Sequence, residues 1–294
     1  MTDTPQPPAL NPEAVPFGTR LSAAMDVHGP LCVGIDPHPH LLHAWGLDDD
    51  AAGLDTFALR CVEALAGHVA VVKPQSAFFE RHGSRGVATL ERVVGGLRTS
   101  GTLCLVDAKR GDIGSTMQAY ADAYAGHEST LAGDAVTVSP YLGFASLRPL
   151  LDLASLTGRG VFVLGLTSNP EGAQVQQAVT ADGRSVAAGV VDAVAAENAG
   201  HTGMGSVGLV VGATVGAVVA DLDINLAASR APLLAPGVGA QGATSADLER
   251  VFGRARAQVL PASSRQVLVA GPEVGALREA ARRTAGQCAA ALGR

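Results

Sequence analysis

Aromatic side chains, charged blocks and long apolar runs are all scarce in this sequence of 294 residues, which is 4% aromatic and 16% charged. The net charge of −6 comes without a cluster of lysine or arginine, so general binding to nucleic acid or to a membrane surface is not expected. A local phosphate site remains compatible, because it needs only one arginine and a few backbone N–H groups. No apolar run reaches the ~18 residues of a transmembrane helix, so no membrane span is expected.

Cysteine is also scarce: Cys32, Cys61, Cys104 and Cys288 form no C-x-x-C pair and no metal-like spacing. Disulfides are therefore not expected, and a reducing cytoplasm is the natural location. Residues 1–16 are rich in proline and lack the apolar core of a signal peptide, so we expect them to be a flexible tail.

What the chain does contain is a regular alternation of short apolar runs with helix-like stretches. We expect strands at 31–36, 69–73, 103–109, 135–139, 161–167, 207–211, 232–235 and 266–270. Eight strands separated by helices predict parallel pairing, and a closed (β/α)8 TIM barrel over 17–294 accounts for both the count and the size as one domain. The alternative, an open doubly wound sheet, would place a G-x-G-x-x-G after the first strand, and none is present.

The stretch Leu103–Thr116, LCLVDAKRGDIGST, places charges at the end of an apolar strand. Asp107 and Lys109 would project to the same side of the strand, roughly 6 to 7 Å apart along it. Asp112 follows Gly111, where the strand must already have become a loop. Charges in this position are costly unless they pair with one another or with a ligand. A surface turn with a salt bridge is the simpler interpretation.

In a barrel, reactive side chains gather at the carboxyl ends of the strands. Reading off the remaining predicted ends gives Asp36, Lys73, Ser139, Thr167, Ser168, Gln241 and Arg265. The glycine-rich loop 236–242 follows the seventh strand and matches the phosphate site of such barrels. Arg265 lies just before the predicted eighth strand, and it reaches that phosphate only if the strand starts later or the loop folds inward.

Each of these residues also has a structural interpretation. Lys73, before Pro74, can be a solvated lysine, and Asp36, before Pro37, can cap a turn. Three histidines have near-helical spacing, namely His38, His40 and His43. No acidic partner is placed for them, so a metal site is not predicted. A purely structural role for all of these residues is less favoured than a functional site, because two lysines and three acids all fall at the same face of one barrel.

A set of motifs, in order along the chain, resembles one known family. They are Gly-Ile-Asp-Pro at 34–37, Val-Lys-Pro-Gln at 72–75, Asp-Ala-Lys-Arg-Gly-Asp-Ile at 107–113, Ser-Pro-Tyr-Leu-Gly at 139–143, Thr-Ser-Asn-Pro at 167–170, Pro-Gly-Val-Gly-Ala-Gln-Gly at 236–242 and Ser-Ser-Arg at 263–265. The chain is similar to orotidine 5′-phosphate decarboxylases, in their longer bacterial branch that includes actinobacterial enzymes. The resemblance covers about residues 17 to 290.

The resemblance implies decarboxylation of orotidine 5′-monophosphate to uridine 5′-monophosphate (UMP), the last step of pyrimidine synthesis, with no cofactor and no metal. It implies an array of Lys73, Asp107, Lys109 and Asp112 around the scissile carboxylate, with Lys109 as the proton donor to C6. The substrate-binding residues that it implies are Asp36 and Lys73 at the ribose, Ser168 at the pyrimidine, Gln241 and Arg265 at the phosphate, and Ile113 and Thr116 beside Asp112.

The resemblance also implies a homodimer, in which Asp112 crosses into the partner's active site. Two alternatives remain. One is a related metal-dependent barrel that acts on a sugar phosphate, such as a keto-gulonate phosphate decarboxylase or a hexulose phosphate synthase. The other is a non-catalytic nucleotide-binding barrel that keeps only the phosphate site.

Overall fold

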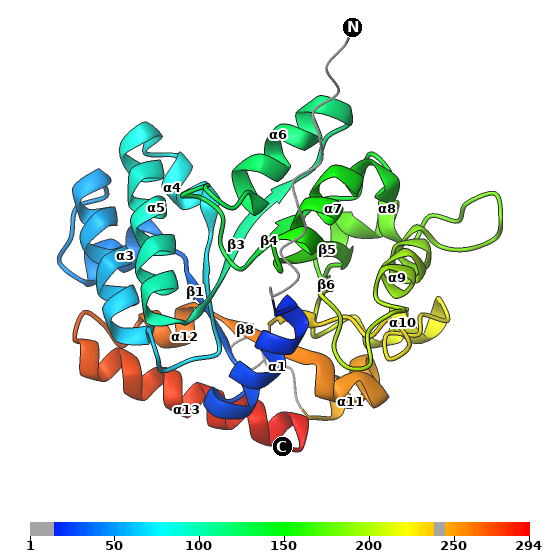
Figure 1. Ribbon diagram of the computed structural model, residues 1–294. Coiled ribbons are helices and arrows are strands. Elements are labelled where there is room, and N and C mark those ends of the chain that lie inside the picture. The colour runs from blue at the N-terminus through cyan, green and yellow to red at the C-terminus, as the bar shows by residue number, and fades with distance from the viewer. Residues whose placement is uncertain (1–14, 238–244) are drawn as a thin grey trace, which may run out of the picture.

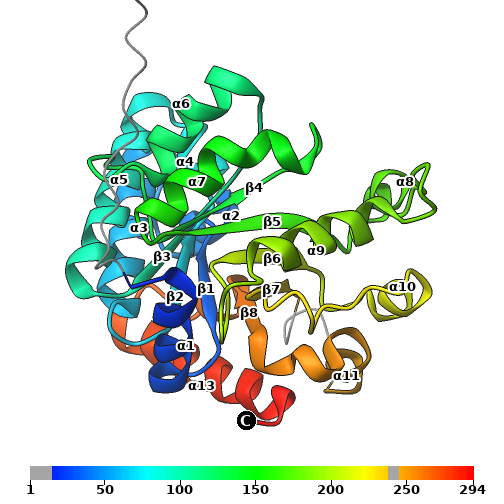
Figure 2. The same cartoon turned by 45° about the vertical axis from the view of Figure 1, so that its right-hand side comes forward.

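The protein is a closed barrel of eight parallel strands, as predicted, with helices arranged around the outside (Figures 1 and 2). The computed structural model describes residues 15–237 and 245–294. The strands pair in chain order, and the last closes the ring by pairing with the first. They are β1 (Cys32–Ile35), β2 (Val71–Pro74), β3 (Leu103–Arg110), β4 (Ala135–Val138), β5 (Gly160–Leu166), β6 (Val207–Val211), β7 (Leu233–Pro236) and β8 (Val259–Ser263).

Most helices of the described residues lie between these strands in the chain and cover their outer face (Figure 1). In chain order they are α1 (Phe17–His28), α2 (Pro39–Ala44), α3 (Ala51–Leu65), α4 (Ser76–Glu80), α5 (Gly83–Ser100), α6 (Gly114–Ala125), η1 (Phe144–Leu147), α7 (Arg148–Leu156), η2 (Pro170–Gly172), α8 (Ala173–Gln176), α9 (Val186–Glu197), α10 (Gly216–Asp221), α11 (Ser245–Phe252), η3 (Gly253–Gln258), α12 (Arg265–Leu268) and α13 (Val274–Leu292). None of them is long and apolar enough to cross a membrane.

Two apolar clusters build the barrel, one inside it and one between its strands and the outer helices. The inner cluster includes Phe17, Leu21 and Met25 of α1, packed on side chains from most of the strands. The Phe17 ring meets Phe162 of β5 edge to face, with 5.9 Å between the ring centroids. Because α1 packs against the interior of the barrel in this way, the opposite, carboxyl end of the strands is left to form a site.

The eighth strand was predicted in the wrong place. The predicted segment 266–270 lies in and just after helix α12, whereas the strand that closes the barrel is Val259–Ser263. Its sequence contains Pro261, and a proline inside a run counts against a strand because it cannot donate to the ladder. The apolar residues that follow Arg265 suggested a strand, but they are the buried side of a short helix, with Val267 and Leu268 fully buried.

The sequence predicts helices over 116–131 and 215–229, and both end earlier in the structure. Helix α6 stops at Ala125, where Gly126 leaves the helical conformation and adopts extended backbone. Helix α10 stops at Asp221. Residues 1–14 of the predicted tail lie outside the described residues, and so does Gln241.

Candidate active site

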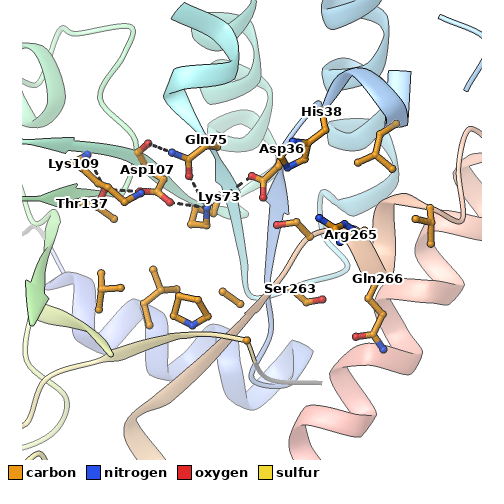
Figure 3. A pocket seen from close by; sticks show the side chains of 18 residues that line it. Asp36, His38, Lys73, Gln75, Asp107, Lys109, Thr137, Ser263, Arg265 and Gln266 are labelled. Atoms are coloured by element: carbon orange, nitrogen blue, oxygen red, sulfur yellow. Dashed lines mark hydrogen bonds and ion pairs between the residues drawn. The ribbon is translucent and has the colours of Figure 1, made fainter. Parts of the chain in front are cut away.

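A cavity of about 620 Å³ lies at the carboxyl ends of the strands (Figure 3). Five of the predicted site residues line it: Asp36, Lys73, Asp107, Lys109 and Arg265. They come from the ends of β1, β2 and β3 and from the start of α12, segments that are far apart in sequence. The cavity therefore confirms that these side chains are brought together at one end of the barrel.

The centre of the site is a carboxylate between two ammonium groups. Lys73 Nζ lies 2.8 Å from Asp107 Oδ2, and Lys109 Nζ lies 2.5 Å from Asp107 Oδ1. The Lys73 and Asp107 side chains are buried, at 8% and 7% exposure, whereas Lys109 is 45% exposed and reaches into the cavity. Lys73 and Lys109 are also the only lysines in the sequence. Every lysine of the chain is thus paired with the same carboxylate.

The charges of this array shift the pKa of its buried members in opposite directions. Burial alone would raise the pKa of Asp107, but the ammonium groups of Lys73 and Lys109 outweigh it and lower that pKa from 3.8 to about 2. Burial alone would lower the pKa of Lys73, but the carboxylates of Asp36 and Asp107 outweigh it and raise that pKa above its ordinary value. Both groups are therefore ionised at neutral pH.

Asp36 continues the array on the side of Lys73 that faces away from Lys109 (Figure 3). Its Oδ1 is 3.9 Å from Lys73 Nζ, too far for a hydrogen bond, and this buried oxygen has no hydrogen-bond partner among the described residues. The same holds for the buried hydroxyl of Ser263, which also lines the cavity. Buried polar atoms are normally satisfied, so these two oxygens are suited to contact the hydroxyl groups of a ligand.

Arg265 lies at the cavity because the eighth strand ends before it rather than beginning after it. It is the first residue of α12 and follows Ser264, directly beyond β8. The close approach of this segment to β1 needs glycine at position 34, since a Cβ there would lie 2.0 Å from Ser264 Oγ. The prediction that Arg265 belongs to the site is consistent with this position, which is the one that barrel phosphate sites use.

The other predicted site residues that lie within 15–237 and 245–294 do not line the cavity. Asp112 lies in the loop after β3, where its Oδ1 accepts a hydrogen bond from the N–H of Ile113 at 2.8 Å. Ile113 is 61% exposed, and Thr116 and Ser168 are exposed as well. Within the described part of this chain, Asp112 forms no ion pair with either lysine. The roles predicted for these residues, and for Gln241, stay predictions.

Several polar residues that line the cavity are not predicted as site residues by the sequence, among them Gln75, Thr137 and His38. Gln75 Nε2 donates to the Asp107 carbonyl oxygen at 3.3 Å, and its Oε1 lies 3.4 Å from Lys73 Nζ. Its place two residues after Lys73 in an extended segment was a usable signal. Thr137 is a polar residue inside an otherwise apolar strand, and its hydroxyl donates to Asp107 Oδ1 at 2.8 Å.

The histidines do not create a metal site in this structure. His38 and His40 stack with 5.4 Å between their ring centroids, and burial is the main cause that lowers the pKa of His38. Among residues 15–237 and 245–294, no group of three or more histidine, cysteine, aspartate or glutamate side chains is arranged to hold a metal ion.

Known proteins resemble the chain over nearly its whole length. A protein of Salinispora arenicola (strain CNS-205) named orotidine 5′-phosphate decarboxylase is 62% identical over 276 residues, which are 94% of this chain and 98% of that one. A crystal structure from Streptomyces avermitilis, described as a candidate orotidine 5′-phosphate decarboxylase, is 59% identical with a TM-score of 0.91, covering 95% of this chain and 97% of that one.

More distant structures share the same architecture. The Leishmania donovani OMP decarboxylase is 30% identical with a TM-score of 0.74, covering 95% of this chain and 100% of that one. Residues 29–280 match the family described as orotidine 5′-phosphate decarboxylase / HUMPS. With a barrel of this topology, a lysine–aspartate–lysine array at its mouth and relatives of this identity, the chain belongs to the orotidine 5′-phosphate decarboxylase / HUMPS family.

Proposed function

We propose that this chain decarboxylates orotidine 5′-monophosphate to UMP, without a metal or an organic cofactor. The observation that carries the proposal is the array in which Asp107 lies between the ammonium groups of Lys73 and Lys109, inside the cavity. Relatives that are 62% and 61% identical are named for this activity. We propose that this reaction is the last step of pyrimidine synthesis.

The chemistry needs a fixed positive charge next to a ring carbon. The bond between C6 and the carboxylate carbon breaks, carbon dioxide leaves, and the electron pair stays on C6. The Lys109 ammonium stabilises that charge and then gives a proton to C6, forming the C–H bond of UMP and leaving a neutral amine that regains its proton from water. Lys109 suits this role because it is 45% exposed and lines the cavity, whereas Lys73 is buried.

Asp107 would lie beside the substrate carboxylate, a like-charge contact that eases as carbon dioxide leaves. A role of Asp107 in positioning the two lysines has more support than this like-charge effect, because both ammonium groups donate hydrogen bonds to it. At the far side of the cavity, Asp36 would bind the ribose hydroxyls, and Arg265 with Gln241 would bind the phosphate. Binding energy from that distant phosphate can be used to orient the ring at Lys109.

We further propose a homodimer in which Asp112 completes the partner's site. In support, Asp112 does not line the cavity of its own chain and lies next to the exposed Ile113. The loop after β4 lies alongside, since Ser139 N–H donates to the Arg110 carbonyl oxygen at 2.8 Å. Two further apolar side chains of that loop are exposed, Tyr141 at 75% and Leu142 at 53%. Exposed apolar side chains on two neighbouring loops suit a subunit interface.

The metal-dependent sugar-phosphate enzyme is the less favoured alternative. In that chemistry the acids of the D-x-K motif are near a divalent cation, whereas here Asp107 accepts hydrogen bonds from Lys73, Lys109 and the Thr137 hydroxyl. A carboxylate that already binds two ammonium groups is a poor ligand for a further cation.

We also propose a cytoplasmic location, which the four buried, unpaired cysteine thiols support.

The experiment that tests the activity is an ultraviolet assay for the loss of orotidine 5′-monophosphate, run with and without a chelator. We expect equal rates in both. A rate that falls with the chelator and recovers with added divalent metal favours the alternative.

Lys109→Ala should abolish turnover and still bind UMP, because Arg265 at the phosphate is unchanged. Near-normal turnover in this variant contradicts the role of Lys109.

Mixing two inactive variants tests the shared site. Lys109→Ala and Asp112→Asn, each inactive alone, should partly regain activity when their subunits exchange, because one site of the hybrid dimer then has both native residues. Subunit exchange is verified separately with a size-tagged copy. If exchange occurs and activity does not return, Asp112 acts within its own chain or not at all.

A further inference from the structure

Thr137 is the one polar side chain in strand β4, and it is almost completely buried, at 1% exposure. Its strand neighbours Val136 and Val138 are apolar and equally buried. A hydroxyl in such surroundings is unfavourable unless it is hydrogen-bonded. A valine would fill nearly the same volume without that requirement, so the hydroxyl at this position calls for a reason.

The hydroxyl is bonded twice, to the two residues at the centre of the site. Thr137 Oγ1 donates to Asp107 Oδ1 at 2.8 Å and accepts the backbone N–H of Lys109 at 3.0 Å. The Lys109 ammonium donates to the same Asp107 oxygen at 2.5 Å. The three residues therefore form a closed ring of hydrogen bonds, in which the threonine links the carboxylate of one residue to the backbone of the other (Figure 3).

The ring occurs where the regular pairing of β3 with β4 is broken. Val106 pairs with Val136 and Arg110 with Val138, so three residues of β3 stand opposite the single residue Thr137 of β4. Lys109 lies in this irregular stretch with a φ of 49°, a left-handed conformation that is unfavourable for a residue with a side chain. Irregularities of this kind re-aim side chains and are common beside active sites.

A Lys109 N–H in a broken ladder would lack its usual strand partner, and the Thr137 hydroxyl takes that partner's place. The same hydroxyl holds the Asp107 carboxylate from the side opposite Lys73, which binds the other oxygen at 2.8 Å. It thus sets both the backbone from which the Lys109 side chain extends and the carboxylate to which its ammonium is bonded.

We propose that Thr137 is a positioning residue for the reaction: its hydroxyl holds Asp107 and the left-handed Lys109 backbone so that the Lys109 ammonium faces the reacting carbon. The proposal rests on the decarboxylase function proposed above, in which Lys109 is the proton donor. Thr137 does not itself need to touch the reacting atoms. Its effect is expected on the rate of the chemical step rather than on the binding of the nucleotide, which the opposite side of the cavity provides.

The test compares Thr137→Val, which removes the hydroxyl at nearly constant volume, with Thr137→Ser, which keeps it. For Thr137→Val we expect kcat for orotidine 5′-monophosphate to fall about 10- to 100-fold, the scale of a small misplacement of a catalytic group, with UMP affinity within about twofold of wild type. Thr137→Ser should restore most of kcat. The acidic limb of the kcat profile should move to higher pH in Thr137→Val, because Asp107 loses a donor that favours its ionised form.

A matched control is Thr89→Val, which removes a buried threonine hydroxyl that donates to the carboxylate of Asp55 at 3.0 Å, between α5 and α3. It should leave kcat unchanged.

The composition of the chain supplies a direct structural readout. Because Lys73 and Lys109 are the only lysines, protein labelled with ¹⁵N-lysine has two backbone amide signals. In Thr137→Val the Lys109 signal should shift and exchange faster with water, while the Lys73 signal stays.

The results for the wild type and for the Thr137 variants separate the proposed function from the positioning role of Thr137. If the wild type does not decarboxylate the substrate, the proposed function fails. If the wild type is active and Thr137→Val keeps kcat within about twofold, the positioning role is wrong. If Thr137→Val does not fold, the comparison passes to Thr137→Ser and Thr137→Cys, which differ by oxygen for sulfur, a much weaker hydrogen-bonding atom. Equal kcat values in that pair also overturn the proposal.

Discussion

Replacing Asp107 with asparagine removes one charge from the centre of the array while keeping the shape of the side chain. An amide oxygen can accept from one of the two ammonium groups, but the amide nitrogen then faces the other. Lys73, which is 8% exposed, would retain Asp36 at 3.9 Å as its nearest carboxylate. We expect Asp107→Asn to be destabilised as well as inactive.

The size of the effect follows from the pKa of Asp107. A shift from 3.8 in an unperturbed carboxyl to about 2 in the folded protein corresponds to roughly 2.5 kcal/mol of stability at pH 7. Removing one partner of a buried ion pair typically costs about 3–5 kcal/mol, and the remaining contact of Lys73 with Asp36 places this case at the lower end. We therefore expect the free energy of unfolding to fall by about 2–3 kcal/mol.

The pH dependence has a defined sign. Asp107 has a lowered pKa in the folded state, so its contribution is present above pH ~4 and is lost as the pH falls toward 2. The difference between wild type and Asp107→Asn should therefore be constant from pH 7 to 5 and about half as large at pH 3. Equilibrium unfolding in urea measures it, followed by the fluorescence of Trp45, the single tryptophan, at one fixed protein concentration.

Asp55→Asn is the matched control, because Asp55 also accepts from a threonine hydroxyl and from a cation, Arg92. That pair is far more exposed, with the side chains at 31% and 57%, so its loss should cost less than about 1 kcal/mol. The reasoning is refuted if Asp107→Asn costs no more than this control. It is also refuted if the difference from wild type grows as the pH falls.

Three further substitutions test other parts of the site and of the barrel. Lys109→Arg keeps a positive charge that cannot release its proton near neutral pH, so turnover should fall by at least about 10³-fold while UMP titrations change little. Arg265→Ala should weaken UMP binding at least about tenfold and leave uridine binding unchanged, as measured by calorimetry. Trp45→Phe loses the buried hydrogen bond from Nε1 to the Leu268 carbonyl oxygen at 3.0 Å, which should cost about 1–2 kcal/mol in urea unfolding followed by circular dichroism.

The barrel could be predicted because its strands are apolar runs between helix-like segments, a pattern that is local in sequence. The eighth strand could not, since it contains Pro261 while the apolar residues of α12 imitate a strand. The error had a consequence for function. It placed Arg265 before a strand, at the wrong end of the barrel, although the residue follows β8 and lines the cavity.

The pairing of Asp107 with Lys109 could also be predicted, because a spacing of two residues puts both side chains on one side of a strand. The observed contact brings the charged atoms to 2.5 Å, because the long lysine side chain spans the distance between the two backbone positions. The backbone around Lys109 nevertheless differs from that of a regular strand, since its pairing with β4 is irregular and its conformation is left-handed. Neither leaves a signal within β3, and the partner that they require, Thr137, lies 28 residues away in a strand that appears wholly structural.

The use of lysine in this chain connects its composition to its chemistry. Arginine serves at every other position that carries a permanently cationic side chain, from surface ion pairs to the Arg20–Asp134 contact at the base of the barrel. An arginine is always charged and spreads that charge over a planar group, whereas lysine offers a compact charge and a transferable proton. A chain that keeps lysine at two positions, both bonded to Asp107, places it where those two properties are needed together. One lysine is buried and holds the carboxylate, and the other reaches the cavity, where it would supply the proton in the proposed reaction.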